Sequence, residues 1–387
     1  MIESPFAFYR GAAAVMASDL SSTPVTGIEV HACGDAHLLN FGLFGSPERT
    51  LLFDVNDFDE TLFAPWEWDV KRLATSATVA ARQNGFDELI TGEITRAGVR
   101  SYREWMAVFA KMTALDVFYS RVEAEKALSL SKTTGPGTRK QLDKVKTNTS
   151  SRVISKLTFA SADGIPRIID QPPILSHSQE LQSEERVRRF FETYRTTVRK
   201  DVQFLLRSFH LVDVARKVVG VGSVGTRCYI ALLLDRNNSP LFLQIKEADR
   251  SVLEPHWKQT KVERQGQRVV EGQQIMQAAS DVFLGWAVDE EGRDFYVRQF
   301  KDMKGAVEVS NLSSSALREY LELCGWTLAR AHAQSGGAQE ISEYLGNGEQ
   351  FDAAITSFAR SYAGQNSIDH QALVDAVKTG QIAAVTA

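Results

Sequence analysis

One acidic stretch near the N-terminus, residues 30–61, constrains the fold of this chain more than any other. It reads VHACGDAHLLNFGLFGSPERTLLFDVNDFDET, and its Gly-Ser-Pro turn between two short apolar runs predicts a β-hairpin. Asp35 and Asn40 would lie at the entry to this hairpin, and Asp54 and Asp57 at its exit. Carboxylates gathered at one end repel each other unless a cation is present. Because Mg²⁺ takes oxygen ligands from one or two carboxylates and from substrate phosphates, the stretch predicts a magnesium–phosphate site.

Length and charge narrow the class of protein. The 387 residues can bury a large core and exceed one typical domain. With 44 basic and 48 acidic residues the net charge is −4, so nothing demands nucleic acid or an acidic membrane as a partner. No apolar run approaches the roughly 20 residues that span a bilayer, and the start MIESPFAFYRG lacks the pattern of a secretory signal. Cys33, Cys228 and Cys324 are far apart and odd in number, so we expect a reduced, cytoplasmic, two-lobed protein.

A glycine-rich segment follows much later in the chain. It lies between two predicted strands, and a third strand ends at Lys246. A dinucleotide-binding fingerprint would require a helix after the glycines. Strands on both sides are instead typical of the glycine-rich loop that covers the ATP phosphates in protein kinases, with a lysine on the third strand. We therefore expect Lys246 to bind the α- and β-phosphates, beneath a loop that contains Gly220, Gly222, Ser223 and Gly225.

A kinase lysine is held by a glutamate from the following helix. The helix predicted for about residues 262–280 supplies Glu271, which shares a face with Ile275. Glu263 is the alternative. The next predicted strand, residues 295–300, would then lead into the hinge beside the adenine.

Because the later segment is similar to part of a kinase, the spacings in the acidic stretch can be compared with those of a kinase catalytic loop. A kinase catalytic loop carries an Asp that accepts the substrate proton and, five residues later, an Asn that holds Mg²⁺. Asp35 and Asn40 have this spacing, and Asp54 follows fourteen residues after Asn40. Spacing favours Asp54 as the main metal ligand. Asp57 is kept as a second ligand because Asp57-Phe58-Asp59 is similar to the Asp-Phe-Gly of kinases.

The loop itself, Gly-Asp-x-His-x-x-Asn, resembles that of the aminoglycoside phosphotransferases, although Cys33 replaces the usual first histidine. The resemblance implies that Asp35 is the catalytic base, that His37 orients the loop, and that Asp69 braces it from the next helix. Arg10 is either a phosphate or carboxylate partner or an ordinary surface arginine. A zinc site built on the histidines and Cys33 is disfavoured, since no fourth ligand is visible. The absence of a Gly-x-Ser-x-Gly motif argues against a serine hydrolase.

The order of these motifs is reversed relative to ordinary kinases. The catalytic loop comes first, and the helical sequence LARAH, which resembles the helix that normally leads into it, lies near the C-terminus. A circular permutation would produce this order, with the chain cut between that helix and the catalytic loop and the original ends joined. Proteins tolerate such a change when their termini lie at the surface and close together. We predict an α+β, two-lobed, circularly permuted protein-kinase-like fold. Residues 1–207 would form the helical lobe with the catalytic loop, 208–305 the β-rich lobe, and 306–387 the remaining helices.

The whole chain also resembles the bacterial family called domain of unknown function 2252. The matching segments run from residue 4 to about 366 and include SPFAFYRG, CGDAHLLNFG, NDFDET, WEWDVKRLATS, RVVEGQQIMQAASDVFLGW, YVRQFKDMKG, LARAHAQSG and FDAAITSFARSYAGQN. This resemblance implies membership of the kinase-like superfamily and names no substrate. Because members carry more chain before SPFAFYRG, we expect this chain to be short at its N-terminus.

Together these features predict an ATP- and Mg²⁺-dependent phosphotransferase that acts on the hydroxyl group of a small molecule. Two alternatives remain: a nucleotide-binding pseudokinase or regulatory module, and a kinase-like enzyme that transfers AMP. The expected partners are a nucleotide and a small-molecule acceptor, without nucleic acid or membrane, and the oligomeric state stays open.

Overall fold

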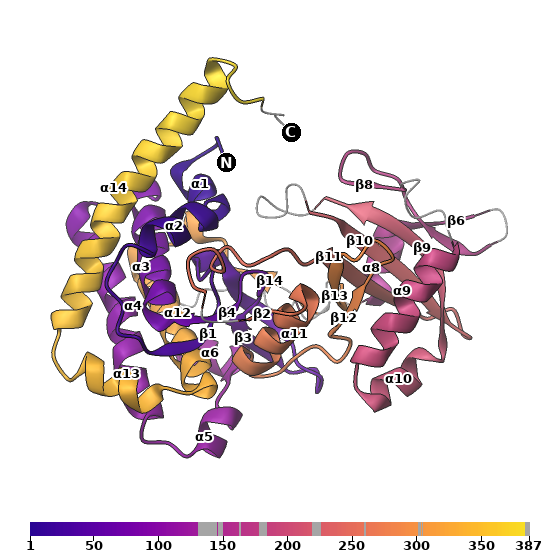
Figure 1. Ribbon diagram of the computed structural model, residues 1–387, viewed down its shortest axis with the longest axis horizontal. Helices are drawn as coiled ribbons and strands as arrows, with labels where there is room; N and C mark the ends of the chain where they lie inside the picture. The colour runs from indigo at the N-terminus through magenta and orange to yellow at the C-terminus, as the bar shows by residue number, and fades with distance from the viewer. Residues whose placement is uncertain are drawn as a thin grey trace.

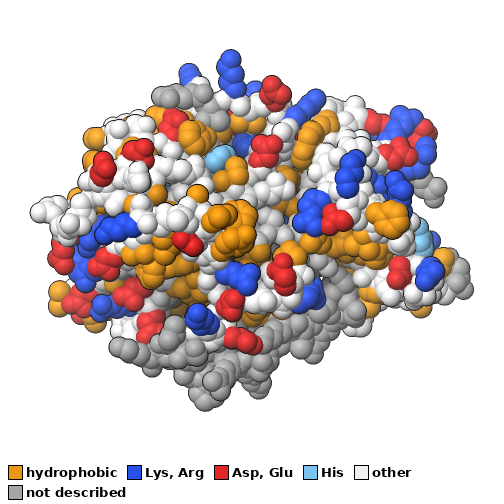
Figure 2. Space-filling view, turned by 90° about the horizontal axis from the view of Figure 1, so that it is seen from below, with side chains coloured by type: hydrophobic (Ala, Val, Ile, Leu, Met, Phe, Trp, Pro, Cys, Tyr) orange, Lys and Arg blue, Asp and Glu red, His pale blue; other side chains and the backbone are white. Residues whose placement is uncertain are grey.

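The computed structural model describes residues 1–130, 145, 150–161, 164–177, 184–218, 226–258, 261–300, 303 and 305–383. The chain combines helices with several antiparallel sheets. A helical part lies on the left of Figure 1, and a six-stranded sheet lies on the right. None of the helices described is both long and apolar enough to cross a membrane. On the face shown in Figure 2, basic and acidic side chains are interspersed, as the small net charge suggests.

Four long helices form the helical part, and they come from both ends of the sequence. α3 (Trp66–Gln83) and α4 (Glu88–Phe109) pack with α12 (Ser314–Ser335) and α14 (Gln350–Lys378). α4 and α12 approach so closely that a Cβ on Gly325 would lie 2.4 Å from the backbone oxygen of Gly98. The shorter helices are α1 (Pro5–Gly11), α2 (Ala13–Leu20), α5 (Ala114–Tyr119), α6 (Ala124–Leu130) and α13 (Ala338–Leu345).

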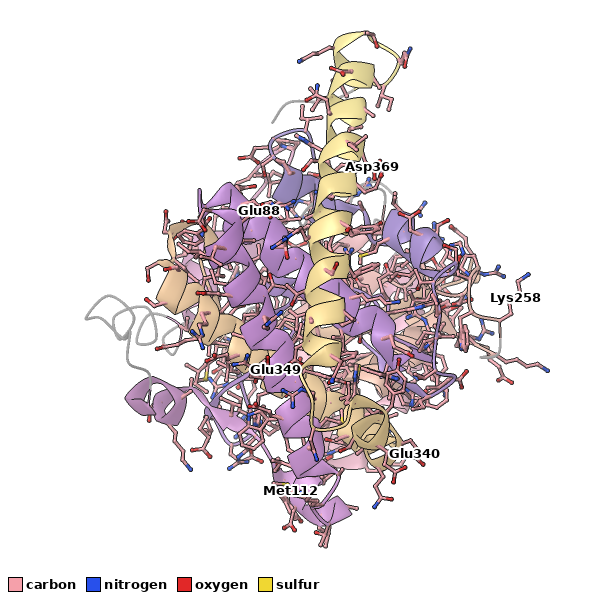
Figure 3. The ribbon with its side chains drawn as sticks, turned by 90° about the vertical axis from the view of Figure 1, so that its left-hand side faces the viewer. Glu88, Met112, Lys258, Glu340, Glu349 and Asp369 are labelled. Atoms are coloured by element: carbon pink, nitrogen blue, oxygen red, sulfur yellow. The ribbon has the colours of Figure 1, made fainter. Side chains whose placement is uncertain are left out.

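The first and last helices described, α1 and α14, lie on the same side of the helical part. α14 runs the length of this side (Figure 3) and contacts α1. The side-chain amide of Asn366 on α14 donates a hydrogen bond of 3.1 Å to the backbone oxygen of Pro5. N- and C-terminal segments are thus joined into one packed unit.

The predicted acidic hairpin is present. β2 (Phe41–Gly45) pairs with β3 (Leu51–Val55), with Phe41 opposite Val55. β14 (Gly305–Ala306) and β5 (Val122–Glu123) extend this sheet at its two edges. The segments before and after the hairpin form a second, two-stranded sheet of β1 (Glu29–Ala32) and β4 (Leu62–Pro65).

The large sheet has the strand order β12-β13-β11-β10-β9-β8. Its strands are β8 (Leu175–Ser176), β9 (Phe209–Lys217), β10 (Cys228–Asp235), β11 (Pro240–Glu247), β12 (Gly285–Val288) and β13 (Asp294–Gln299). α11 (Gln265–Met276) follows β11 and lies between this sheet and the helical part (Figure 1). The strand expected at residues 295–300 corresponds to β13.

Each face of the large sheet is covered by segments that precede β9 in the chain. α9 (Glu184–Thr197) and α10 (Lys200–Leu206) bury aromatic and aliphatic side chains against one face. The expected boundary at residue 207 assigns these helices to the helical part, whereas they pack on the sheet. Apolar side chains of α8 (Ser150–Leu157) pack with part of the opposite face, together with Ile168 of β7 (Pro166–Ile168), which pairs with β6 (Thr158–Ala160).

A histidine clasp holds the β8 edge of this sheet. His177 Nδ1 lies 2.9 Å from Asp170 Oδ1, and its Nε2 lies 3.2 Å from both carboxylate oxygens of Asp213 on β9. Asp213 also accepts a hydrogen bond of 2.7 Å from the backbone N–H of Ile168. Burial lowers the pKa of His177, but the hydrogen bonds to the two carboxylates outweigh it, so that the pKa is raised above 6.5.

We expect this clasp to stabilise the protein below the ordinary histidine pKa and to weaken as the pH rises through the raised one. His177→Gln should therefore lower the thermal midpoint more at about pH 6 than at about pH 9. Thermal denaturation of both proteins at the two pH values measures the difference. If His177→Gln lowered the thermal midpoint equally at both pH values, the imidazolium charge would play no part in the stabilisation.

Candidate active site

Asp35 lies in a tight turn between β1 and the hairpin. The turn depends on Gly34, whose φ of +76° is a conformation that side chains with a Cβ rarely adopt. A Cβ at this position would lie 2.2 Å from the backbone oxygen of Glu60. The loop that carries Asp35 therefore packs directly against the segment that leaves the hairpin.

Gly34→Ala is expected to lower the free energy of unfolding by more than the roughly 1–3 kcal/mol that a strained backbone conformation costs, because it adds a clash with a backbone atom. Gly27 is a matched control, since its φ is +83° and nothing lies within 4 Å of its Cβ position. Urea denaturation of Gly34→Ala and Gly27→Ala compares the two. Equal losses would mean that the contact with Glu60 does not constrain the turn.

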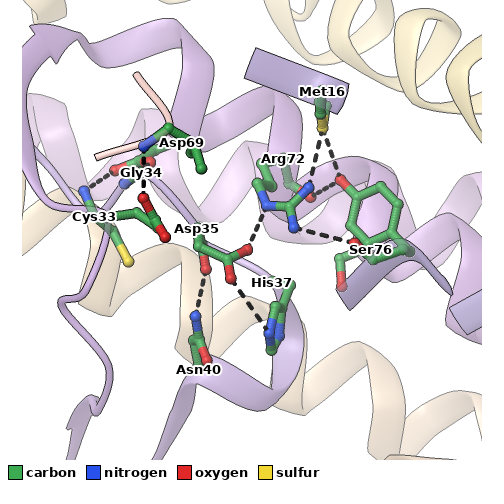
Figure 4. A network of polar contacts seen from close by, with 12 residues as sticks. Met16, Cys33, Gly34, Asp35, His37, Asn40, Asp69, Arg72 and Ser76 are labelled. Carbon is green, nitrogen blue, oxygen red and sulfur yellow. Dashed lines mark hydrogen bonds and ion pairs between the residues drawn. The ribbon is translucent and has the colours of Figure 1, made fainter. Parts of the chain in front are cut away.

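Asp69, in the first turn of α3, fixes the backbone of this turn, as the sequence predicted. Its two carboxylate oxygens accept hydrogen bonds from the backbone N–H groups of Cys33 (2.5 Å) and Gly34 (2.9 Å; Figure 4). His332 of α12 lies 3.2 Å from the same carboxylate and is itself 2.9 Å from the Tyr102 hydroxyl. Since all these groups are buried, the turn is held by a network without access to water.

Arg72, one helical turn after Asp69, orients the carboxylate of Asp35. Its Nε donates a hydrogen bond of 2.5 Å to Asp35 Oδ1 (Figure 4), and its Nη2 donates one of 3.1 Å to the backbone oxygen of Tyr9. Its guanidinium also lies 4.6 Å from the centre of the Tyr9 ring. Burial opposes the charge of Arg72, but Asp35 and Tyr9 raise its pKa, so it stays cationic. The Asp35 side chain remains 18% exposed and can meet a ligand.

His37 and Asn40 complete the loop. His37 Nδ1 accepts a hydrogen bond of 3.1 Å from the backbone N–H of Leu39, and Nε2 lies 3.8 Å from Asp35 Oδ2. Burial lowers the pKa of His37 to about 4, so the ring is neutral at pH 7 and its Nε2–H faces Asp35. The side-chain nitrogen of Asn40 donates a hydrogen bond of 2.6 Å to the backbone oxygen of Asp35, which leaves Oδ1 as the atom that could ligate a metal.

Asp54 does not have the surroundings of a metal ligand. It is only 2% exposed, and its carboxylate oxygens accept hydrogen bonds of 2.8 Å from the backbone N–H groups of Val55 and Ala278. The guanidinium of Arg330 lies 3.9 Å away. Asp54 therefore joins the hairpin to the end of α11, and Asp57 is the more accessible of the two predicted metal ligands.

Asp57 and Asp59 present the accessible carboxylates at the hairpin exit, with side chains 39% and 33% exposed. Lys246 on β11 forms an ion pair with Asp59 Oδ2, and its Nζ lies 3.8 Å from Asp57 Oδ1. The Tyr296 hydroxyl on β13 donates a hydrogen bond of 2.6 Å to Asp59 Oδ1. Burial opposes the charge of Lys246, but the two aspartates raise its pKa, so it remains an ammonium. The large sheet and the hairpin thus meet at this cation.

Glu271 does not meet Lys246, contrary to expectation. Its side chain is exposed on α11 and accepts a hydrogen bond of 2.7 Å from Gln267. The buried face of α11 instead carries Arg268, which donates to the backbone oxygens of Thr61 (2.5 Å), Asp59 (2.8 Å) and Asp249 (2.9 Å). The predicted phosphate-covering residues Gly220, Gly222, Ser223 and Gly225 lie outside the described residues.

The sequence alone missed two members of the site. Arg72 could have been found, because it lies three residues after the brace Asp69 and so on the same face of the helix. Asp59 appeared only as the last residue of the Asp-Phe-Asp pattern, and its pairing with Lys246 depends on contacts between distant segments. Arg10, on the last turn of α1, lies close enough to His37 for its charge to affect that ring.

Residues 1–376, almost the entire chain, match the sequence profile of DUF2252, described as an uncharacterized protein conserved in bacteria. The chain belongs to the DUF2252 family. No curated protein and no solved structure gives a significant match to this DUF2252 protein.

Whether the DUF2252 site fits Mg²⁺ can be judged from its donors. Among the residues described, no group of three or more His, Cys, Asp or Glu side chains is arranged to hold a metal without other ligands. Asp57 and Asp59 do converge on one cation, the ammonium of Lys246. Two carboxylates fit Mg²⁺ only where phosphates and water complete its six oxygen ligands. The donor set therefore suits a metal that arrives with a phosphate compound.

Proposed function

We propose that this DUF2252 protein is an ATP- and Mg²⁺-dependent phosphotransferase with a two-lobed, circularly permuted kinase-like fold. The convergence of Lys246 from the large sheet with Asp57 and Asp59 from the hairpin carries this proposal. Lys246 lies on a strand of the large sheet and faces acidic residues that follow a hairpin. Kinases bind the phosphates and the metal with a strand lysine and carboxylates of this kind.

The surroundings of Glu60 support a shared site for these acidic residues and Asp35. Burial, helped by the negative charges of Asp59 and Asp35, raises the pKa of Glu60 to about 7, although the backbone N–H of Val252 opposes the shift with a hydrogen bond of 2.7 Å. The backbone oxygen of Glu60 is also the atom against which Gly34 packs. The base and the metal-side carboxylates therefore lie on either side of one residue.

The meeting of α12 with β1 supports the permutation. The Ser335 hydroxyl, at the end of α12, accepts a hydrogen bond of 3.1 Å from the backbone N–H of His31 on β1. A Cβ on Gly337 would lie 3.3 Å from the side chain of Ile28. The end of this C-terminal helix thus lies beside the strand that leads to Asp35, as it would if a single cut separated the two.

Each residue then has a role in transfer. Asp35 accepts the proton of the acceptor hydroxyl while the hydroxyl oxygen attacks the γ-phosphorus. The bond between the γ-phosphorus and the β–γ bridging oxygen breaks, and its electron pair leaves with ADP. Lys246 binds phosphate oxygens, and Asp57 and Asp59, with Asn40 Oδ1, would hold Mg²⁺. When bound, that ion neutralises phosphate charge. Arg72 and neutral His37 keep the Asp35 carboxylate in place. The acceleration of phosphoryl transfer then comes from the positioning of the reacting groups and from preorganised charge.

Incubation with ATP labelled separately at the α- and γ-phosphates tests the proposal. The protein is mixed with Mg²⁺ and a bacterial extract of small molecules, and labelled products are separated. We expect label from the γ-position in a new small molecule and none from the α-position. Transfer of the α-label would instead indicate an AMP transferase. Nucleotide binding without any transfer would indicate a pseudokinase.

A further inference from the structure

Arg10 is a partly buried cation, and one N–H of its guanidinium meets no acceptor in the described part of the chain. Its Nε is inaccessible to solvent and has no hydrogen-bond partner among the residues that the structure describes. A buried N–H group left without an acceptor costs about 1–3 kcal/mol, and more when the group is charged. The planar guanidinium of arginine is well suited to bind a carboxylate or phosphate through two parallel hydrogen bonds. Such a group therefore calls for an oxyanion.

Arg10 directly follows a residue that contacts the active site, and it lies close enough to His37 for its charge to affect that ring. The preceding residue, Tyr9, donates a hydrogen bond of 2.8 Å to the backbone oxygen of Arg72, which in turn binds Asp35. The other end of α1 is fixed by its Ser4 cap and by Asn366 of α14. α1 is thus attached at both ends, and it holds Arg10 one residue from the contact that orients the base.

The other charged groups around the base are already engaged. Arg72 is bonded to Asp35 and Tyr9, and Lys246 is paired with Asp59 on the metal side. Burial lowers the pKa of His37, and the positive charges of Arg72 and Arg10 lower it further, so His37 adds no charge. Of the cations described around Asp35, Arg10 is the one with a buried donor still to be satisfied.

We propose that Arg10 is the receptor for an oxyanion carried by the acceptor, which makes the substrate a hydroxylated carboxylate or phosphomonoester. The inference rests on the proposed function, because Asp35 must face the acceptor hydroxyl. In the proposed function the α- and β-phosphates of the donor bind Lys246, which is paired with Asp59 and not with Asp35. A polycationic acceptor such as an aminoglycoside would be repelled by Arg10, so the similarity of the loop to aminoglycoside phosphotransferases does not extend to their substrate.

Inorganic phosphate serves as the probe, and calorimetry measures its affinity with and without saturating MgADP. We expect the wild-type protein to bind phosphate in both conditions, Arg10→Gln to bind it at least about tenfold more weakly, and Arg10→Lys to lie between them. MgATP and MgADP affinities should be the same in all three proteins. Arg188→Gln, at an exposed arginine of α9, is the matched control and should behave as the wild type.

The folding of the variants can be compared directly. Because Arg10→Gln removes a buried donor without a described partner, its thermal midpoint should not fall below that of the wild type. Equal phosphate affinity in Arg10→Gln and the wild type would overturn the inference. A loss of MgATP affinity without a loss of MgADP affinity would also overturn it, by making Arg10 a receptor for the γ-phosphate. Phosphate binding that depends on Arg10 in a protein that binds no nucleotide would support the oxyanion receptor and contradict the phosphotransferase.

Discussion

Replacement of Asp35 by asparagine is expected to slow γ-phosphoryl transfer by about 10²- to 10⁴-fold, the usual contribution of a general base, while MgATP still binds. Asparagine keeps the shape of the side chain, and its oxygen can still accept the hydrogen bond from Arg72 Nε. It cannot accept the proton of the acceptor hydroxyl. Because Lys246, Asp57 and Asp59 are untouched, the nucleotide affinity should follow the wild type.

The rate of label transfer from γ-labelled ATP and the affinity for MgATP are measured on the same preparations. Asp116→Asn is a suitable control, since Asp116 lies on exposed α5 and its carboxylate contacts only the neighbouring Thr113 among the residues described. A thermal denaturation curve shows whether the loss of charge beside buried Arg72 affects folding. ATP turnover at the wild-type rate in Asp35→Asn would remove Asp35 from the role of base.

Local patterns were sufficient for the features that depend on neighbouring residues. The hairpin follows from two apolar runs and a turn, and the bracing role of Asp69 is implied by the resemblance of its neighbourhood to the aminoglycoside phosphotransferases. The early position of the Asp35 loop is itself a property of the sequence, and the permuted order that we propose rests on it. These predictions needed no knowledge of which distant segments meet.

The errors concern the direction in which a side chain points after packing. Glu271 shares a helical face with Ile275, but the rotation of α11 is set by Gly272, where a Cβ would lie 2.3 Å from the side chain of Thr61. That contact leaves Glu271 exposed. Asp54 has the spacing of a metal ligand, but it turns to the backbone N–H of Ala278, which is 224 residues away. No local pattern reports such a contact.

The second large effect is expected at Asp69. Asp69→Ala leaves the buried N–H groups of Cys33 and Gly34 without an acceptor and removes the partner of His332. Each unsatisfied buried donor costs about 1–3 kcal/mol, so the free energy of unfolding should fall by roughly 2–6 kcal/mol. Phosphoryl transfer should fall as well, because the turn that carries Asp35 loses its anchor. Urea denaturation and label transfer measure the two losses.

Asp69→Asn keeps the shape of the side chain but removes its negative charge and one of its two hydrogen-bond acceptors. Asparagine can accept one of the two backbone hydrogen bonds, but its amide group has hydrogens where the second acceptor is needed. Its loss of stability should therefore lie between those of the wild type and Asp69→Ala. Asp201→Ala, at an exposed aspartate of α10, controls for the loss of a carboxylate and should change stability by no more than about 0.5 kcal/mol. If Asp69→Ala were as stable as that control, the turn would be held by Gly34 and Arg72 alone, and the helix would not be its anchor.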